Sequence, residues 1–313
     1  MRKNWKWLLI VIGSMMIMSA CGNKEKSDSR SEKDKLKVTT TFYPMYEFTK
    51  QVAGDLADVE VLVPENQEPH DWEPNPKDIA TVQDSDLFIY NSEYMETFVQ
   101  TIEEAMGTKE TTFVEASNGI TLQEDHELEE ESDHDHEHSH EMDPHVWLSP
   151  ALAMKEVNNI ADSLIKVDPE NATTYEQNRD AYLLKLTALD SKYKEELSKV
   201  SKKEMITQHA AFAYLASDYG LEQVAIAGLS PDEEPSAQKL ADLKSFAEDH
   251  DIQVIYFEET ASKKVAQTLA NEIGAKTEVL STLEVLSKKD KEQGLDYISV
   301  MERNLEKITK GQK

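Results

Sequence analysis

The sequence of 313 residues contains a single cysteine, Cys21, so no disulfide bond can form within the chain. Basic residues are also scarce, because 33 lysines and arginines stand against 61 aspartates and glutamates, for a formal charge of −28. This balance argues against nucleic acid as a partner and is compatible with a cationic ligand or with solubility alone. The sequence also lacks an HExxH motif, which would place two metal ligands on one helix.

The apolar run near the N-terminus is too short for a membrane-spanning helix. Trp7–Met18 has about a dozen residues and follows three basic residues, so residues 1–20 are predicted to be a signal peptide. The small residues before Cys21 resemble a bacterial lipobox, although Met18 stands where leucine is usual. We therefore expect a lipid anchor at Cys21, which holds the protein on the extracellular face of a bacterial cell membrane. Cleavage at another small residue, which would leave a free thiol, is the alternative.

Folded structure is expected from residue 36 onward, after a polar segment, residues 21–35, that reads as a disordered tether. Short β-branched runs then alternate with segments of helical apolar spacing. The predicted strands are Leu36–Phe42, Val59–Val63, Asp86–Asn91 and Thr111–Ser117, and the predicted helices are Tyr43–Gly54, Lys77–Gln83 and Met95–Met106. Such alternation is typical of a parallel sheet with helices on both faces.

A second alternation follows a long helical stretch that begins at Pro150, with Ser149 as its N-cap, and continues from Asn171 to Ser198. Its predicted strands are Lys203–Gln208, Gln223–Gly228, Ile252–Glu258 and Lys276–Ser281, and its predicted helices are Ala210–Tyr219, Ser236–Asp249, Lys263–Ile273 and Tyr297–Ile308. The two halves share a layout without a sequence repeat. They predict an α/β protein of two lobes, each a mostly parallel four-stranded sheet flanked by helices, joined by a long helix. The predicted limits are 36–149 for the N-terminal lobe, 150–178 for the linking helix and 179–310 for the C-terminal lobe.

Residues 122–143 interrupt the first alternation, because this segment has almost no apolar content and many like charges. It is expected to be a mobile insertion in the N-terminal lobe. Its five irregularly spaced histidines favour weak, exchanging coordination, since ordering a flexible chain costs about 1–2 kcal/mol per residue. We expect either a low-affinity zinc collector or sensor, or an acidic loop that binds metal only incidentally. These histidines are His126, His134, His136, His138 and His140.

Three other histidines each lie beside a predicted strand end or helix start. His70 follows the strand Val59–Val63, His145 precedes the long helix, and His209 ends the strand in KEMITQHAAFAYL. Ligands of open α/β sheets bind outside the carboxyl ends of the strands. Three imidazoles converging there would suit a borderline cation such as Zn²⁺. The spacing alone does not distinguish such a site from three separate hydrogen-bonding histidines. His250 is expected at the end of a helix or in the loop after it.

The segments around these histidines carry a family resemblance. PHDWEPNPKDI, DPHVWLSP, ITQHAAFAYLASDYGL, GLSPDEEPSAQKLADL and VLSTLE occur in this order within residues 36–310. Together they resemble the zinc-binding branch of the metal-specific substrate-binding lipoproteins of bacterial ABC importers, solute-binding protein family 9. The resemblance implies two α/β lobes, a rigid linking helix and a metal held between the lobes. By position, His70, His145 and His209 match the three ligand histidines of the family.

The fourth ligand of the family is an acidic residue late in the chain, or a water molecule. Glu284 in STLEVL is the best match, and Glu258 and Glu259 are the rivals, for which capping of the next helix is the other interpretation. Three histidines and one carboxylate suit Zn²⁺, whereas Mn²⁺ prefers more oxygen ligands. Family members that carry manganese usually have two acidic ligands, so His209 favours zinc.

The resemblance implies a non-enzymatic protein whose cargo is Zn²⁺ and whose partners are an ABC permease and its ATPase subunit. A monomer is expected, attached to the membrane only through its lipid. A manganese-importer component is one alternative. A second is an extracellular zinc hydrolase, since three histidines and a water form a catalytic site. An additional adhesin role, and the binding of cadmium or copper, stay open.

Four neighbours of the histidines have expected roles of their own. Trp72 and Trp147 are expected to be packing walls that keep the site dry. Asp71 and Asp143 either orient imidazoles or serve as loop and capping residues. The loop Pro231–Pro235 is expected to shape the interface between the lobes.

Overall fold

The computed structural model describes residues 35–65, 67–107, 110–124, 142–231, 233, 235–258 and 264–313. All of these belong to one compact unit, Lys35–Lys313. Several predictions therefore lie outside the described residues. They are the signal peptide, most of the tether, the lipid site Cys21, the rival ligand Glu259 and the five histidines of the acidic segment, His126, His134, His136, His138 and His140.

The described residues form eight strands, which match the eight predicted ones in order. The strands are β1 (Leu36–Thr40), β2 (Ala57–Val61), β3 (Leu87–Tyr90), β4 (Thr112–Glu115), β5 (Glu204–Thr207), β6 (Glu222–Ala225), β7 (Val254–Phe257) and β8 (Lys276–Val279). The α-helices are α1 (Tyr43–Ala53), α2 (Pro76–Gln83), α3 (Val99–Met106), α4 (Pro150–Val167), α5 (Ala172–Leu197), α6 (Ala213–Tyr219), α7 (Ala237–Asp249), α8 (Lys264–Ile273), α9 (Lys288–Glu292) and α10 (Tyr297–Gly311).

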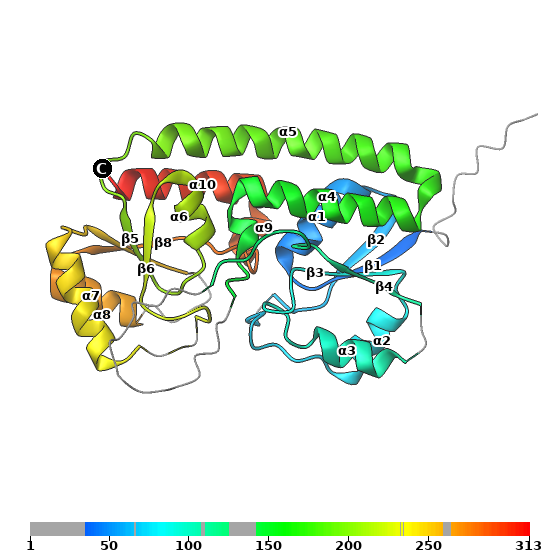
Figure 1. Cartoon of the computed structure of the whole chain (residues 1–313), viewed down its shortest axis with the longest axis horizontal. Helices are drawn as coiled ribbons and strands as arrows, with labels where there is room; N and C mark the ends of the chain where they lie inside the picture. The colour runs from blue at the N-terminus through cyan, green and yellow to red at the C-terminus, as the bar shows by residue number, and fades with distance from the viewer. Residues whose placement is uncertain are drawn as a thin grey trace, which may run out of the picture. The chain divides into compact units, whose positions relative to one another are not determined.

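The strands form two parallel sheets with the same internal order, β2-β1-β3-β4 and β6-β5-β7-β8. Figure 1 shows α2 and α3 on the outer side of the first sheet and α7 and α8 on the outer side of the second, while α4, α5 and α10 lie along the opposite side. The predicted α/β class with two similar halves is therefore confirmed. All four residues of the central strand β3 are buried, as expected for a parallel strand covered on both faces.

The linking region is a pair of helices rather than one helix over 150–178. Helix α4 begins as predicted, with the Ser149 hydroxyl accepting a hydrogen bond from the Leu152 amide and with Pro150 in the first turn. It ends at Val167 because Pro169 cannot continue the hydrogen-bond ladder, and the chain turns through a short 3₁₀ segment. The long element is α5, which runs back across both halves (Figure 1).

Helix α5 contacts both halves of the molecule, which explains how it links them. Near its start, the Asn178 amide donates to the Val52 carbonyl at the end of α1, at 2.9 Å. Near its other end, the Tyr193 hydroxyl donates to the Met301 carbonyl in α10, at 2.7 Å. A largely shared hydrophobic core runs from the first sheet through α4 and α5 to α10, and a smaller separate core lies around α7 and α8.

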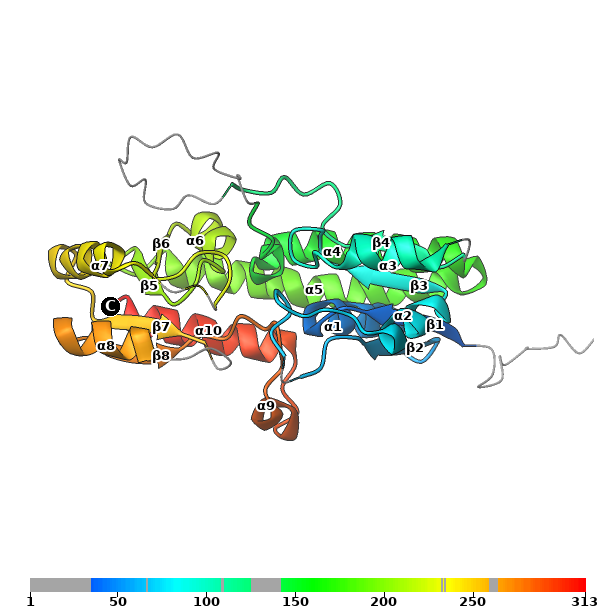
Figure 2. The ribbon, with the colours of Figure 1, turned by 90° about the horizontal axis from the view of Figure 1, so that it is seen from below.

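Several elements differ from their predicted limits; for example, α6 begins three residues after Ala210 and β6 ends three residues before Gly228. Strand β2 ends two residues early, although Leu62 and Val63 still donate to the Thr40 and Thr41 carbonyls. Helix α3 begins four residues later than Met95, because a turn precedes it. Helix α9 was not predicted, since its five residues, KKDKE, carry no apolar periodicity; it projects from the body in Figure 2.

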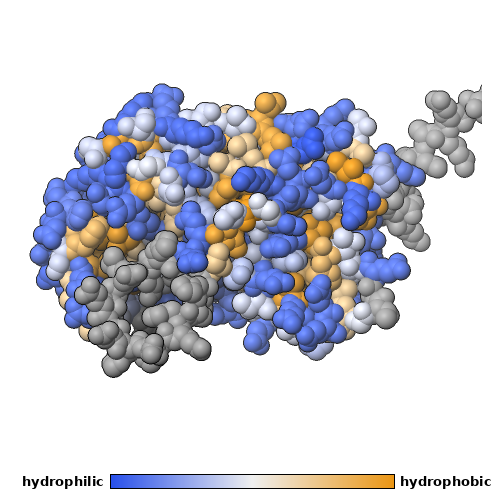
Figure 3. Space-filling view, viewed as in Figure 1, coloured by the Kyte–Doolittle hydropathy of each residue, from blue (hydrophilic) through white to orange (hydrophobic). Residues whose placement is uncertain are grey.

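The surface is mostly polar on the face that Figure 3 shows. Hydrophilic residues cover most of the face in Figure 3, with apolar patches scattered among them. No helix in the described part of the chain has both the length and the apolar character needed to span a membrane.

Candidate metal centre

Four residues from four distant segments meet at one point: His70, His145, His209 and Glu284. One possible ligand atom from each lies within 4.8 Å of those of the other three. His70 follows β2, His209 comes two residues after β5, and Glu284 lies in the loop after β8. The carboxyl ends of parallel strands from both sheets thus supply three of the four groups. His145 comes from the segment that leads into α4.

The distances agree with a tetrahedral shell. The Nε2 atom of His145 lies 3.2 Å from Nε2 of His70 and 3.4 Å from Nε2 of His209. The Oε1 atom of Glu284 lies 3.6 Å from Nε2 of both His145 and His209, and 3.8 Å from Nε2 of His70. Bonds of about 2.0–2.1 Å to a tetrahedral Zn²⁺ would place neighbouring ligand atoms about 3.3 Å apart. A small ion therefore fits between the four atoms with little rearrangement.

Glu284 supports a cation at this point independently of the distances. Its side chain is 1% exposed, and neither carboxylate oxygen has a hydrogen-bond donor among the described residues. Burial raises the pKa of Glu284, but the neighbouring imidazoles of His209 and His70 outweigh it and hold the pKa well below its ordinary value. A buried carboxylate that stays charged without donors is costly unless a cation compensates it.

His145 is fixed by a carboxylate on the far side of its ring. The Oδ1 atom of Asp143 lies 2.8 Å from His145 Nδ1 and also accepts from the His145 backbone amide, at 2.9 Å. This contact orients the ring and leaves Nε2 facing the other three groups. Burial is the main reason that the pKa of His145 is lowered, and the neighbouring imidazoles add to the effect. His145 is therefore a neutral imidazole, the form that binds metal.

His209 has a similar anchor in the second half of the molecule. Its Nδ1 atom lies 2.5 Å from Oε1 of Glu258, and its carbonyl accepts hydrogen bonds from the side chains of Thr207 and Gln223. Burial acts to lower the pKa of His209, but Glu258 and Glu284 raise it well above the ordinary value. Without metal this imidazole holds a proton, which a cation would have to displace. Glu258 thus orients His209 here, while Glu284 supplies the fourth side chain of the cluster.

His70 is the most exposed of the four, with 10% of its side chain accessible. It lies beside a cavity of ≈ 520 Å³ whose lining includes Asp71, Glu93 and Glu233. Two residues before it lies Glu68, a half-buried carboxyl whose pKa is raised to about 9 by burial and by the charge of Glu284. Asp71 is exposed, so of the two aspartates that could orient imidazoles only Asp143 does so.

Sequence reasoning missed two supports of the segment that carries His145. The Asn91 side chain donates to the Pro144 carbonyl at 2.9 Å, and the Asn91 amide is held in turn by the buried carboxylate of Glu96. The position of Asn91 in the sequence could have identified it, since it is a polar residue directly after the buried strand β3. The indole nitrogen of Trp147 donates to the Thr282 carbonyl at 2.8 Å, so this tryptophan is more than a packing wall.

The remaining predicted residues do not join the site. The Trp72 ring packs edge-on against Phe98, with ring centroids 4.8 Å apart. His250 is the C-cap of α7, as predicted, and its ring stacks on Phe246. Pro231 and Pro235 line a separate cavity of ≈ 480 Å³ beside α8.

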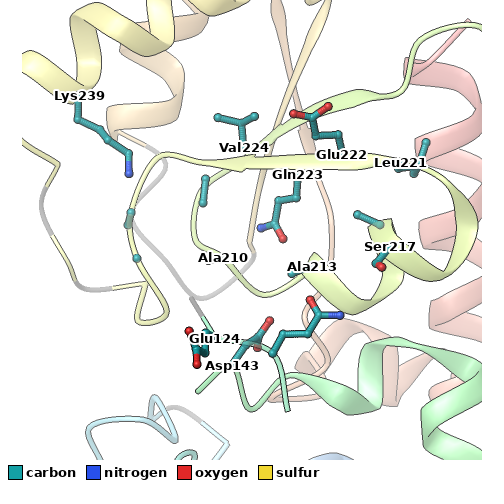
Figure 4. A pocket seen from close by; sticks show the side chains of 15 residues that line it. Glu124, Asp143, Ala210, Ala213, Ser217, Leu221, Glu222, Gln223, Val224 and Lys239 are labelled. Carbon is teal, nitrogen blue, oxygen red and sulfur yellow. The ribbon is translucent and has the colours of Figure 1, made fainter. Parts of the chain in front are cut away.

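A further cavity of ≈ 410 Å³ is lined by Asp143 and Gln223 and by none of the four clustered residues. Figure 4 shows Asp143 and Gln223 in its wall, with Lys239 on the opposite side. Its floor is formed mainly by small residues of β6, α6 and the loops beside them. Neither His145 nor His209 lines this cavity, although Asp143 and Gln223, which contact them, do.

Comparison with known proteins places the chain among zinc-uptake proteins. The family described as "ZnuA: Zinc-uptake complex component A periplasmic" matches residues 38–311. The "High-affinity zinc uptake system protein ZnuA" of Bacillus subtilis (strain 168) is 58% identical over 311 residues, which cover 98% of both chains.

Two streptococcal relatives extend the comparison. The "Zinc-binding lipoprotein AdcA" of Streptococcus pneumoniae is 49% identical over 96% of this chain, which spans only 60% of that relative. The crystal structure of its Zn(II)-bound ZnuA-like domain matches with a TM-score of 0.76 at 47% identity, covering 89% of this chain and 99% of that domain. The laminin-binding protein Lmb of Streptococcus agalactiae, titled "a bifunctional protein with adhesin and metal transporting activity", matches with a TM-score of 0.80 at 32% identity, over 89% of this chain and 100% of that one.

Proposed function

The chain belongs to the ZnuA family of zinc-uptake components, and we propose that it captures Zn²⁺ between its two halves through His70, His145, His209 and Glu284. The observation that carries this proposal is the spacing of the four ligand atoms around one point, together with a buried carboxylate that has no donor. The three imidazoles and one carboxylate form the nitrogen-rich, singly charged set that zinc accepts. Manganese, which prefers oxygen ligands, is the weaker candidate for the same site.

The release of the ion belongs to the same proposal. The protein delivers Zn²⁺ to the permease of an ABC importer, and the ATPase subunit of that importer drives passage through the membrane. The segments 36–149 and 179–310 act as the two lobes that hold the ion. Docking on the permease loosens this grip by moving one set of ligands away from the other. Cys21 carries the lipid that keeps the protein at the extracellular face of the membrane, and Cys21→Ser should release it into the medium.

The direct test is metal content combined with titration. Protein purified without chelator is expected to contain one tightly held zinc, with anomalous scattering at the zinc edge located among the four side chains. His145→Ala should lose this zinc, while the matched variant His250→Ala should retain it, because His250 lies at the end of α7. Full zinc content in His145→Ala would contradict the proposed site.

Two other functions are weaker on the structural evidence. For a zinc hydrolase the fourth position must be open to water, and here Glu284 faces that position. We therefore propose a binding protein that is not an enzyme.

An adhesin role in addition to transport is supported only by the streptococcal relative described as bifunctional. Binding of the purified protein to immobilised laminin, with and without zinc, would test it.

The histidines of the acidic segment form a secondary, low-affinity zinc region in this proposal. Deletion of residues 122–142 should slow zinc uptake only when zinc is scarce. Unchanged uptake under scarcity would leave the segment without a role in capture.

A further inference from the structure

Glu284 is presented by a buried loop, Leu280–Glu284, in an uncommon backbone conformation. Leu283 has φ = +60°, in the left-handed region that residues other than glycine rarely adopt. Its side chain is 1% exposed and belongs to the main hydrophobic core. Such a conformation persists only where the surrounding structure imposes it. The contacts of this loop therefore determine the direction in which the Glu284 carboxylate points.

One set of contacts fixes the start of the loop to α10. The Asn304 side chain donates to the Ser281 carbonyl at 2.7 Å and accepts from the Ser281 amide at 3.1 Å. The Ser281 hydroxyl then accepts from the Leu283 amide at 3.3 Å. Asn304 is completely buried, so water does not compete for these hydrogen bonds.

Another contact of the loop comes from the segment that carries His145. The indole nitrogen of Trp147 donates to the carbonyl of Thr282, directly before the left-handed Leu283. Trp147 is completely buried, and its ring centroid lies 5.2 Å from that of His145. The Trp147 carbonyl also accepts from the Tyr297 hydroxyl at 2.6 Å. One side chain therefore joins the segment of the second ligand histidine to the loop of the carboxylate.

We propose that Trp147 is a positioning residue that sets the Glu284 carboxylate at its distance from His145 by holding the Thr282 carbonyl. This inference rests on the proposed function, because it concerns the geometry of the same four ligands. Without the indole donor, the Thr282 carbonyl loses a buried partner and Leu283 is free to rotate toward an ordinary conformation. That rotation would turn Glu284 away from the three imidazoles while leaving the imidazoles in place.

The test is a double-mutant cycle between Trp147 and Glu284. Trp147→Phe keeps an aromatic ring and removes the N–H donor, whereas Glu284→Ala removes the ligand that the donor positions. Zinc affinity is measured by competition with a chromogenic chelator in the wild type, both single variants and the double variant. Trp147→Phe is expected to lower zinc affinity about 10-fold or more in the wild type, as is usual for partners that orient a ligand. In the Glu284→Ala background the same substitution is expected to change zinc affinity less than about twofold, because the two effects share one ligand.

Trp72→Phe is the matched control. Trp72 also follows a ligand histidine by two residues and is buried, but its ring packs on Phe98 rather than against the Glu284 loop. This substitution should change zinc affinity by the same factor in both backgrounds. An equal loss from Trp147→Phe in both backgrounds would overturn the positioning role, since the indole would then act on His145 or on the whole fold. Full zinc affinity in Glu284→Ala would instead contradict the proposed ligand set.

A second variant keeps the proposal testable if Trp147→Phe does not fold. Asn304→Asp retains the acceptor for the Ser281 amide and places an oxygen against the Ser281 carbonyl, which disturbs the same loop from the side of α10. A loss of zinc affinity that disappears in the Glu284→Ala background would support the loop as the positioning device. A loss of the same size in both backgrounds would contradict it.

Discussion

His70 and His145 face each other across 3.2 Å, yet the protein holds them in opposite ways. His145 is completely buried, and Asp143 binds the far nitrogen of its ring. His70 is partly exposed in an irregular segment after β2, and no described residue accepts from its Nδ1. His209 resembles His145, with Glu258 in the place of Asp143. The site therefore consists of a preorganised part and one ligand on a surface segment.

This difference indicates how an ion could enter a buried site. Fixed ligands lose little conformational entropy when they bind, so they provide affinity. A ligand on a surface segment can move away at low cost, since such segments open more readily than buried elements. The cavity beside His70 lies on this side of the site. We expect zinc to enter through the His70 side while the other three ligands stay in place.

The largest expected effect on zinc affinity distinguishes a fixed ligand, His145, from the ligand on the surface segment, His70. His145→Ala should lower zinc affinity more than about 100-fold, because even partners that only orient a ligand contribute 10–100-fold. His70→Ala should lower it less, roughly 10- to 100-fold, because water can reach the vacated position from the cavity. Competition with a chelator measures the zinc affinity of both variants. A larger loss of affinity in His70→Ala than in His145→Ala would contradict the distinction between the two ligands.

The carboxylates behind the rings provide the next test. Asp143→Asn should lower zinc affinity about 10- to 100-fold, because the negative partner that orients His145 is lost. Asp71→Asn, beside the exposed ligand, should change it less than about twofold. Equal losses in these two variants would show that simple negative charge near the site, rather than orientation of the imidazole, provides the affinity.

The proton on His209 predicts a pH dependence of intermediate size. Because Glu258 and Glu284 raise the pKa of His209, zinc binding at neutral pH should release about one proton. Affinity should fall by up to about tenfold per pH unit as the pH drops below this raised pKa. Calorimetry in buffers of different ionisation enthalpy measures the number of protons, and Glu258→Gln should reduce it. A proton count of zero in the wild type would contradict the prediction.

The same pKa shifts contribute to the pH dependence of the stability of the metal-free protein. Because the pKa of His209 is raised in the folded state, the group stabilises the fold. The full contribution is present at pH values below the unfolded-state pKa of about 6.5, and it is lost as the pH rises through the folded-state pKa. The lowered pKa of Glu284 also stabilises the fold. This contribution is present at pH values above the unfolded-state pKa of about 4.3–4.5, and it is lost as the pH falls through the folded-state pKa. Both contributions are present together between these limits, so the metal-free protein should gain most from this cluster in mildly acidic solution.

The smallest expected effect concerns the only described ion pair between α9 and the His70 segment. Lys291 of α9 lies 2.5 Å from Glu65, and both side chains are more than a third exposed. Exposed pairs contribute about 0–1 kcal/mol, so Lys291→Ala should change the zinc dissociation rate less than about fivefold. Stopped-flow release into excess chelator measures this rate. A larger acceleration would show that α9 restrains the His70 segment.

Much of the fold could be predicted from the sequence, because local chemistry determines it. The β-branched runs produced all eight strands in order, and Ser149 with Pro150 marked the start of α4 correctly. The limits of the helices and strands were predicted less accurately than their order. Strand β2 keeps parallel hydrogen bonds past its assigned end, and α9 has no apolar face to reveal it. The break at Pro169 was visible in the sequence, but the backward course of α5 depends on packing against α1 and α10.

The site could be predicted only in part. Each of the three histidines lay beside a strand end or helix start, and the family resemblance pointed to Glu284 ahead of Glu258. The sequence contained no sign that Glu258 would bind the far nitrogen of His209. It also contained no sign that Trp147 would reach Thr282, 135 residues away.

The sequence by itself determined the chemical inventory of this protein: imidazoles and carboxylates in excess, two alternating α/β halves, and caps and breaks at Ser149 and Pro169. These features depend on residues close together in the chain, so local propensity and periodicity reveal them. Tertiary structure decided between the alternatives left open: Glu284 faces the three imidazoles, while Asp143 and Glu258 bind the far nitrogens of His145 and His209. That choice depends on how packing places segments that are far apart in the sequence, and no local pattern specifies their distances.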